Sequence, residues 1–249
     1  MRDLWSVVRA VLVAGLIAGT AMALFHTLAT APIIDEAIAL EEARAAQAPM
    51  PQAAEPVPPV SREEQQRALP AGLILYGVFM GLLFGAAFPV LEHLLPAVGT
   101  FRRALLAAAA SFWALALFPF LRYPANPPGV GQPETIEMRQ TAFLLAIVLA
   151  VVGLVAACAL ARRLAQPGNR WPAWALALAA YAGYCLAVFL GLPPNPDPAP
   201  VPADLLARFQ LFSLAGLALF WLIFGIVAAT LLRYFERSRD DHALAPARR

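Results

Sequence analysis

Long apolar runs separated by short polar segments extend along most of the chain. Six of these runs reach about 20 residues, the length that an α-helix needs to cross the hydrocarbon core of a bilayer. They lie at approximately residues 7–27, 72–91, 104–121, 141–161, 173–190 and 209–232. Because a backbone in lipid must satisfy its own hydrogen bonds, this pattern predicts an all-α integral membrane protein with six transmembrane helices.

The distribution of arginine gives the six spans an orientation. If the N-terminus is cytoplasmic, the cytoplasmic segments hold 12 arginines and the outer segments hold 6, as the positive-inside rule requires. The acidic residues are distributed the other way, 5 inside and 11 outside. We therefore expect a multi-pass protein with both termini in the cytoplasm.

This orientation divides the chain into six parts, with the spans arranged as three in-out-in hairpins. The parts are the first span with its cytoplasmic N-terminus (1–31), an acidic extracytoplasmic loop (32–70), the second span with a cytoplasmic turn (71–103), two helical hairpins (104–162 and 163–235) and a cytoplasmic tail (236–249). An alternative for the first span is a signal peptide, because residues 29–31 read A-T-A. The uncharged stretch of residues 10–34 exceeds the 7–15 residues of a signal-peptide core, which favours a transmembrane helix.

The first outer loop is acidic and rich in proline. Residues 32–70 carry seven carboxylates, and five prolines interrupt the segment between residues 49 and 59. Residues 34–48 have a helical composition, and Ser61 is a suitable N-cap for a further helix. We expect two short helices outside the membrane, joined by an extended proline-rich tip.

The two remaining outer loops resemble each other. Residues 120–127 and 189–196 both read FLxxPxNP, and the same offset of 69 residues aligns Arg139 with Arg208. Seven of 21 aligned positions are identical, which chance could also produce in a chain with 23 prolines. The alternative is that the second and third hairpins form a parallel repeat, related by an axis along the membrane normal.

Composition excludes much of soluble-enzyme chemistry. Apolar residues make up 61% of the chain, and all 18 basic residues are arginine. Without lysine there is no Walker A loop, pyridoxal phosphate Schiff base or lysine nucleophile. Cys158 and Cys185 lie in apolar runs at different depths, so they are not expected to form a disulfide or share a metal. We expect no enzymatic activity, no permanently bound cofactor and no nucleic-acid partner.

A histidine near the outer end of the first span is a candidate metal ligand. Met22, His26 and Thr30 are spaced to share one helix face, and thioether with imidazole suits a late first-row metal ion. The alternative is a single interfacial histidine that is hydrogen bonded to a neighbour.

Further candidate ligands lie at the two membrane surfaces. Asp35 and Glu36 belong to the acidic outer loop, which raises the local concentration of divalent cations. Glu92 and His93 end the second span at the cytoplasmic side, about 30 Å from His26 across the hydrocarbon. The outer groups and the inner groups can therefore act at the entrance and the exit of an ion path. They cannot bind the same ion at the same time.

Glycines at intervals of four residues predict close helix contacts. Gly77, Gly81 and Gly85 form two GxxxG motifs in the second span, and Gly15 and Gly19 form one in the first. Such motifs let two helix backbones approach closely, so a packing role is expected.

The layout of the whole chain resembles the CbtA family of probable cobalt transporter subunits. Three segments carry the resemblance: LVAGLIAGTAMALFHTLATAPIIDEA (12–37), YPANPPGVGQPETIEMRQTAF (123–143) and LPPNPDPAPVPADLLARFQLFSLAGLALFWLIFGIVAA (192–229). The resemblance implies a protein of the bacterial inner membrane that supplies cobalt for cobalamin synthesis. It also implies a partner, a small single-span CbtB-type subunit with a histidine-rich tail.

These observations favour a subunit of a Co²⁺ uptake system that does not itself hydrolyse ATP. The ion would be captured at the outer face by His26 and the acidic loop, and released near Glu92 and His93. The alternative is a non-conducting scaffold or assembly partner whose GxxxG faces hold another membrane protein. Whether the chain forms a homo-oligomer is left open by the sequence.

Overall fold

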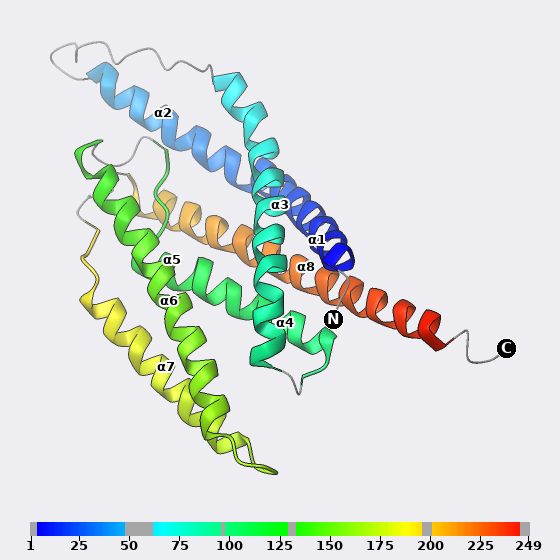
Figure 1. The fold of residues 1–249 in the computed structure, drawn as a ribbon. Helices are drawn as coiled ribbons and strands as arrows, with labels where there is room; N and C mark the ends of the chain where they lie inside the picture. The colour runs from blue at the N-terminus through cyan, green and yellow to red at the C-terminus, as the bar shows by residue number, and fades with distance from the viewer. Residues whose placement is uncertain (1–3, 48–61, 96–97, 129–132, 196–200, 245–249) are drawn as a thin grey trace.

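The computed structural model describes residues 4–47, 62–95, 98–128, 133–195 and 201–244, and within them every regular element is a helix, joined by short non-helical connections. The elements are α1 (Leu4–Phe25), η1 (His26–Thr30), α2 (Ala31–Gln47), α3 (Arg62–Leu94), α4 (Thr100–Ser111), η2 (Phe112–Leu117), α5 (Phe118–Arg122), η3 (Pro133–Thr135), α6 (Ile136–Leu164), α7 (Trp171–Gly191) and α8 (Ala203–Leu244) (Figure 1). They include six helical stretches that are long and apolar enough to cross a membrane. The predicted all-α class and the six spans are confirmed.

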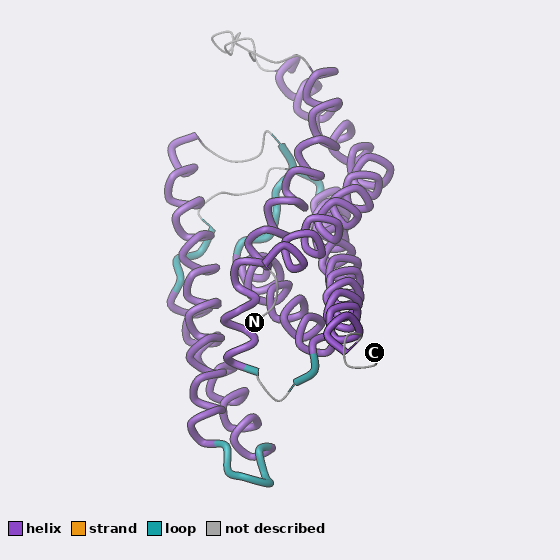
Figure 2. The backbone as a smooth tube through the Cα atoms, turned by 45° about the vertical axis from the view of Figure 1, so that its right-hand side comes forward, coloured by secondary structure: helices purple, strands orange, loops and turns teal. Residues whose placement is uncertain are grey.

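The helices form two groups. In the four-helix group, α1 packs against α3 and α8, and α4 packs against α8. In the second group, α6 and α7 lie side by side (Figures 1 and 2). The π-helical turn η2 joins the groups, because Ala116 belongs to the core of the first and Ala114 to the core of the second.

Among the described residues, the spans of the first expected hairpin, α1 and α3, pack against each other, but the other spans have different main partners. The fifth span, α7, packs along α6 of the preceding hairpin, whereas the sixth span, α8, packs along α1 and α4. Aromatic side chains explain the α6–α7 pairing, since Tyr181 and Tyr184 donate hydrogen bonds to the carbonyls of Ala150 (3.0 Å) and Leu149 (3.1 Å). Gly153 of α6 leaves the space that the Tyr184 ring fills.

Glycines bring α1 and α3 together, as their spacing predicts. A Cβ atom on Gly15 would overlap the carbonyl of Gly77, and one on Gly77 would lie 2.8 Å from Cα of Gly19. Farther along α3, the backbone at Gly81 meets the carbonyl of Val11. These GxxxG faces are therefore used within the chain. The scaffold hypothesis was wrong in assigning them to a partner protein.

The acidic outer pieces are not separate short helices. Residues 4–44 form one uninterrupted helical stretch through α1, η1 and α2, and α3 begins at Arg62 and continues through Pro70 into the second span. The two expected helices are thus extensions of membrane helices. The expected proline-rich tip and its N-cap at Ser61 lie outside the described residues.

Proline explains both π-helical turns. In η1, the N–H of Ala31 donates to the carbonyl of His26, five residues earlier, and position 32 is proline. In η2, the N–H of Phe118 donates to the carbonyl of Trp113, and position 119 is proline. A proline inside a helix has no N–H to donate and clashes with the preceding turn, so the widened turn lets each helix continue.

Replacement of Gly77 by leucine should destabilise the four-helix group. A leucine side chain would collide with the backbone of α1, and overpacking of this kind costs about 1–3 kcal/mol in the free energy of unfolding. Gly72→Leu in the same helix is the control, because a Cβ there meets no atom within 4 Å. Thermal unfolding in detergent should show a lower Tm for Gly77→Leu alone. Equal Tm values would contradict the glycine contact.

Candidate functional site

His26 lies where the first transmembrane helix changes to π-helical geometry. Its side chain is buried, and Nδ1 lies 2.9 Å from Oγ1 of Thr30. The Nε2 edge of the ring faces Gly216 of α8, where a Cβ atom would overlap the imidazole. When Nδ1–H donates to Thr30, Nε2 carries the lone pair that a metal ion binds. Thr30 can thus set the tautomer, and Gly216 gives the ring its space.

Met22 lies in the apolar core of the four-helix group. Its side chain is 5% exposed, and it precedes His26 by about one turn. Both predicted ligands of the first span therefore lie in the interior of the structure.

The predicted outer carboxylates are on α2, where Glu36 forms an ion pair with an arginine of α8. Asp35 and Glu36 are both exposed. Nη2 of Arg208 lies 3.0 Å from both carboxylate oxygens of Glu36, and 3.5 Å from Asp204 one turn earlier on α8. Beside this ion pair, Ile33 and Ala37 of α2 pack against the beginning of α8. Glu36 therefore ties α2 to the beginning of α8.

The predicted inner residues lie at the end of α3 and differ in their surroundings. Glu92 accepts a hydrogen bond from the buried Arg103 at 3.2 Å, whereas His93 is exposed. Arg103 also donates to the carbonyls of Leu95 (3.1 Å) and Val98 (2.6 Å). Glu92 is thus part of a network that holds the turn between α3 and α4.

The structure does not gather these candidates into one metal site. In the part of the chain that is described, no three His, Cys, Asp or Glu side chains lie close enough together to hold a metal ion. Cys158 and Cys185 are free thiols. A complete coordination shell around His26 would need oxygen atoms from backbone, water or another chain.

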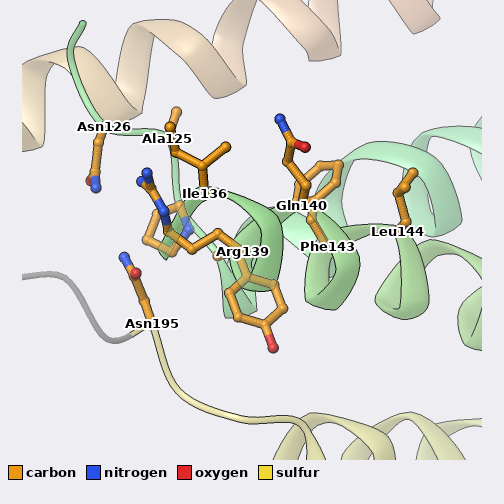
Figure 3. A pocket seen from close by; sticks show the side chains of 10 residues that line it. Ala125, Asn126, Ile136, Arg139, Gln140, Phe143, Leu144 and Asn195 are labelled. Atoms are coloured by element: carbon orange, nitrogen blue, oxygen red, sulfur yellow. The ribbon is translucent and has the colours of Figure 1, made fainter. Parts of the chain in front are cut away.

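An open pocket of about 550 Å³ lies where the two FLxxPxNP loops meet the beginning of α6. We call it the interloop pocket; it is lined by Tyr123, Pro124, Ala125, Asn126, Ile136, Arg139, Gln140, Phe143, Leu144 and Asn195. The polar ends of Asn126, Arg139 and Asn195 point toward one another (Figure 3). Sequence reasoning did not identify these residues as a site, although the repeat had singled out both loops.

Contacts between the two copies of the motif hold the loops in place. The guanidinium of Arg122 donates to the carbonyl of Leu192 and lies 5.2 Å from the ring centre of Phe189. The hydroxyl of Tyr123 donates to the carbonyl of Pro193 at 2.7 Å. The two copies therefore bind each other directly. The two segments that share a sequence motif are therefore also neighbours in the structure.

The chain matches the family described as probable cobalt transporter subunit (CbtA) over residues 5–233 of its 249 residues. It matches no curated protein and no solved structure. The matched region contains the six spans predicted from the sequence and both FLxxPxNP motifs. The resemblance noted from the sequence is therefore confirmed, and the chain belongs to the CbtA family of probable cobalt transporter subunits.

Proposed function

We propose that this chain carries Co²⁺ inward across the bacterial inner membrane, with both termini cytoplasmic, and so supplies cobalt for cobalamin synthesis. Membership of the CbtA family and the six apolar helices support this assignment. The arginine distribution supports the orientation. A small single-span CbtB-type subunit is the proposed partner, and association of several copies of the chain is a further way to complete the path.

The orientation of His26 is the observation that carries the proposal. His26 and Gln210 are the only His, Asp, Glu, Asn or Gln residues in the six predicted spans. Ionisable groups at such positions are costly and mark ion pathways in membrane proteins. Its Nδ1 is engaged by Thr30, so Nε2, which packs against Gly216 of α8, is the nitrogen proposed to bind the ion.

Carbonyl oxygens at the π-helical turns are proposed as further ligands. In η1 each carbonyl accepts from the N–H five residues later, so the Thr27 carbonyl would accept from residue 32. Residue 32 is a proline and has no N–H to donate. The Ala114 carbonyl stands in the same relation to Pro119 in η2. Both turns contact α8, so their oxygens can line one path beside that helix.

The charged groups at the two surfaces are proposed to receive and release the ion. Asp35 and Glu36 attract it at the outer face, and Glu92 and His93 take it up at the inner face. Glu36 is paired with Arg208, and Glu92 is paired with Arg103. A cation that binds either glutamate therefore has to displace the guanidinium of its arginine. A membrane potential of 100 mV favours inward movement of a divalent ion by about 4.6 kcal/mol, which replaces ATP as the source of energy.

The non-conducting scaffold remains the second candidate, favoured by the scarcity of polar side chains in the spans. Its surface for a partner cannot be the GxxxG faces, since these are occupied within the chain. The exposed apolar sides of α6 and α7, the least buried of the six apolar helices, are candidates for such a surface.

Replacement of His26 by alanine should abolish uptake of radioactive cobalt by cells that also express the small partner. Thr30→Val should weaken the apparent affinity for Co²⁺ by about tenfold, because loss of the group that orients a histidine ligand has effects of this size. Thr20→Val is the matched control, since the Thr20 hydroxyl donates to the carbonyl of Leu16 in its own helix at 2.8 Å.

These variants are compared at equal membrane levels. Uptake that depends on the chain but is unchanged in His26→Ala would remove His26 from the path. Uptake that does not depend on the chain would exclude transport and leave the scaffold.

Variants at the inner surface separate a structural role from a role in release. Glu92→Gln should lower the free energy of unfolding by about 1.5–3 kcal/mol, because it weakens a hydrogen bond to the charged Arg103. His93→Ala should leave the Tm unchanged, since the side chain is exposed. If His93 assists release, its variant lowers the rate of cobalt uptake at an unchanged Tm. A normal rate would argue against that role.

A further inference from the structure

The turn that joins α6 to α7 concentrates positive charge. Arg162 and Arg163 lie in the last turn of α6, and Arg170 directly precedes α7. We call residues 162–171 the α6–α7 tip. The sequence holds no aspartate or glutamate from residue 138 to residue 196, so neither helix supplies a carboxylate at this end to balance the three arginines.

The three arginines of the tip are exposed, and none of them forms an ion pair with the part of the chain that is described. Arginines of the neighbouring helix ends differ in this respect. The guanidinium of Arg103 binds Glu92, and that of Arg233 lies 5.8 Å from the ring centre of Phe101. The charge of the tip is thus available to a ligand from outside the chain.

A tight turn holds the charges of both helices together. Gln166 and Asn169 form a bridge across the tip, in which the N–H of Asn169 donates to the Gln166 carbonyl at 3.3 Å. Gly168 has a φ of 86°, a conformation that favours glycine. Since α6 and α7 also pack along each other, the end of one helix lies beside the beginning of the other (Figures 1 and 2).

The length of the apolar stretch of α6 gives the tip its depth in a membrane. Residues 142–161 contain no charged or polar side chain. At 1.5 Å per residue these 20 residues extend about 30 Å, which is the thickness of the hydrocarbon core. Arg162 and Arg163 follow directly and therefore reach the level of the lipid headgroups. Trp171, the first residue of α7, is of a type that is enriched at this level.

Apolar side chains surround the arginines and continue along both helices. In the tip itself Leu164 is 44% exposed and Trp171 is 83% exposed, and Leu160 of α6 and Leu176 of α7 are exposed beyond it. A phospholipid supplies an anionic headgroup to the guanidiniums and acyl chains to these apolar side chains. A dissolved anion or an acidic protein segment matches the charge alone, so the surface favours a lipid.

We propose that the α6–α7 tip binds the headgroup of an anionic phospholipid through Arg162, Arg163 and Arg170. A guanidinium can donate two parallel hydrogen bonds to a phosphate, which suits arginine to this ligand. Because α6 and α7 are the least buried of the six apolar helices, the bound lipid would help to fix this pair in the bilayer. The proposal does not depend on cobalt transport.

Binding is tested on the full chain purified in neutral detergent. Native mass spectrometry measures the retention of phosphatidylglycerol against phosphatidylcholine with the same acyl chains. We expect saturable and selective retention of phosphatidylglycerol that weakens as the ionic strength rises. Equal retention of the two lipids would overturn the proposal. Saturable binding of a polyglutamate peptide without selection of phosphatidylglycerol would also overturn it, and would assign the tip to an acidic protein segment.

Two double variants with the same change in net charge locate the effect. Arg162→Gln with Arg163→Gln should weaken retention of phosphatidylglycerol by roughly 25-fold, since each arginine near an anionic surface contributes about a fivefold preference. Arg102→Gln with Arg237→Gln is the matched control, because both side chains are exposed and lie on α4 and α8. The control should bind as the wild type does, and both variants should keep the Tm measured in detergent alone. Equal losses of retention in the two double variants would overturn the proposal.

Discussion

The close contact between the backbones of α1 and α3 determines how the four-helix group is built. Two helices approach this closely only where glycines face each other, because a larger side chain at either position would push the helices apart. With one face against α3, α1 offers a second face of small residues to α8, and Ala10, Ala14 and Ala18 are completely buried. Because α8 in turn holds α4, α1 and α8 form the central pair of the group.

Hydropathy was sufficient to predict the six spans, but it did not predict which spans pack against each other. An apolar run of about 20 residues has few alternatives to a membrane helix, so the six spans followed from composition and length. The glycine intervals likewise indicated close helix contacts in the first and second spans, but not that these two spans contact each other. The pairing of α7 with α6 depends on how Tyr181 and Tyr184 fit against particular backbone carbonyls, and such a fit has no periodic signal in one sequence.

Proline can end a helix or widen one of its turns, and composition alone does not show which of the two occurs. At Pro32 and Pro119 the helix continues through a widened turn, although proline usually favours a helix end. The neighbouring helices supply the packing that keeps the chain helical there. This is why the acidic segment after the first span is an extension of a membrane helix and not a separate piece.

The candidate site was only partly predictable, because it too depends on contacts between residues that are far apart in the sequence. His26 stood out as a rare ionisable residue in an apolar run, and its neighbour Thr30 was visible one turn later. Its position against Gly216 joins residues 190 positions apart, and the interloop pocket likewise forms only when two distant loops meet. The duplicated motif marked those loops without indicating that they bind each other.

The length of α8 has a mechanical consequence. Its 42 residues extend about 60 Å at 1.5 Å per residue, roughly twice the thickness of the hydrocarbon core. One uninterrupted helix thus carries Arg208 against α2 at one end and Arg233 against Phe101 of α4 at the other. The ion pair of Arg208 with Glu36 and the contact of Arg233 with Phe101 are therefore joined by one continuous helix, so a change in the position of α8 at either contact changes the geometry at the other.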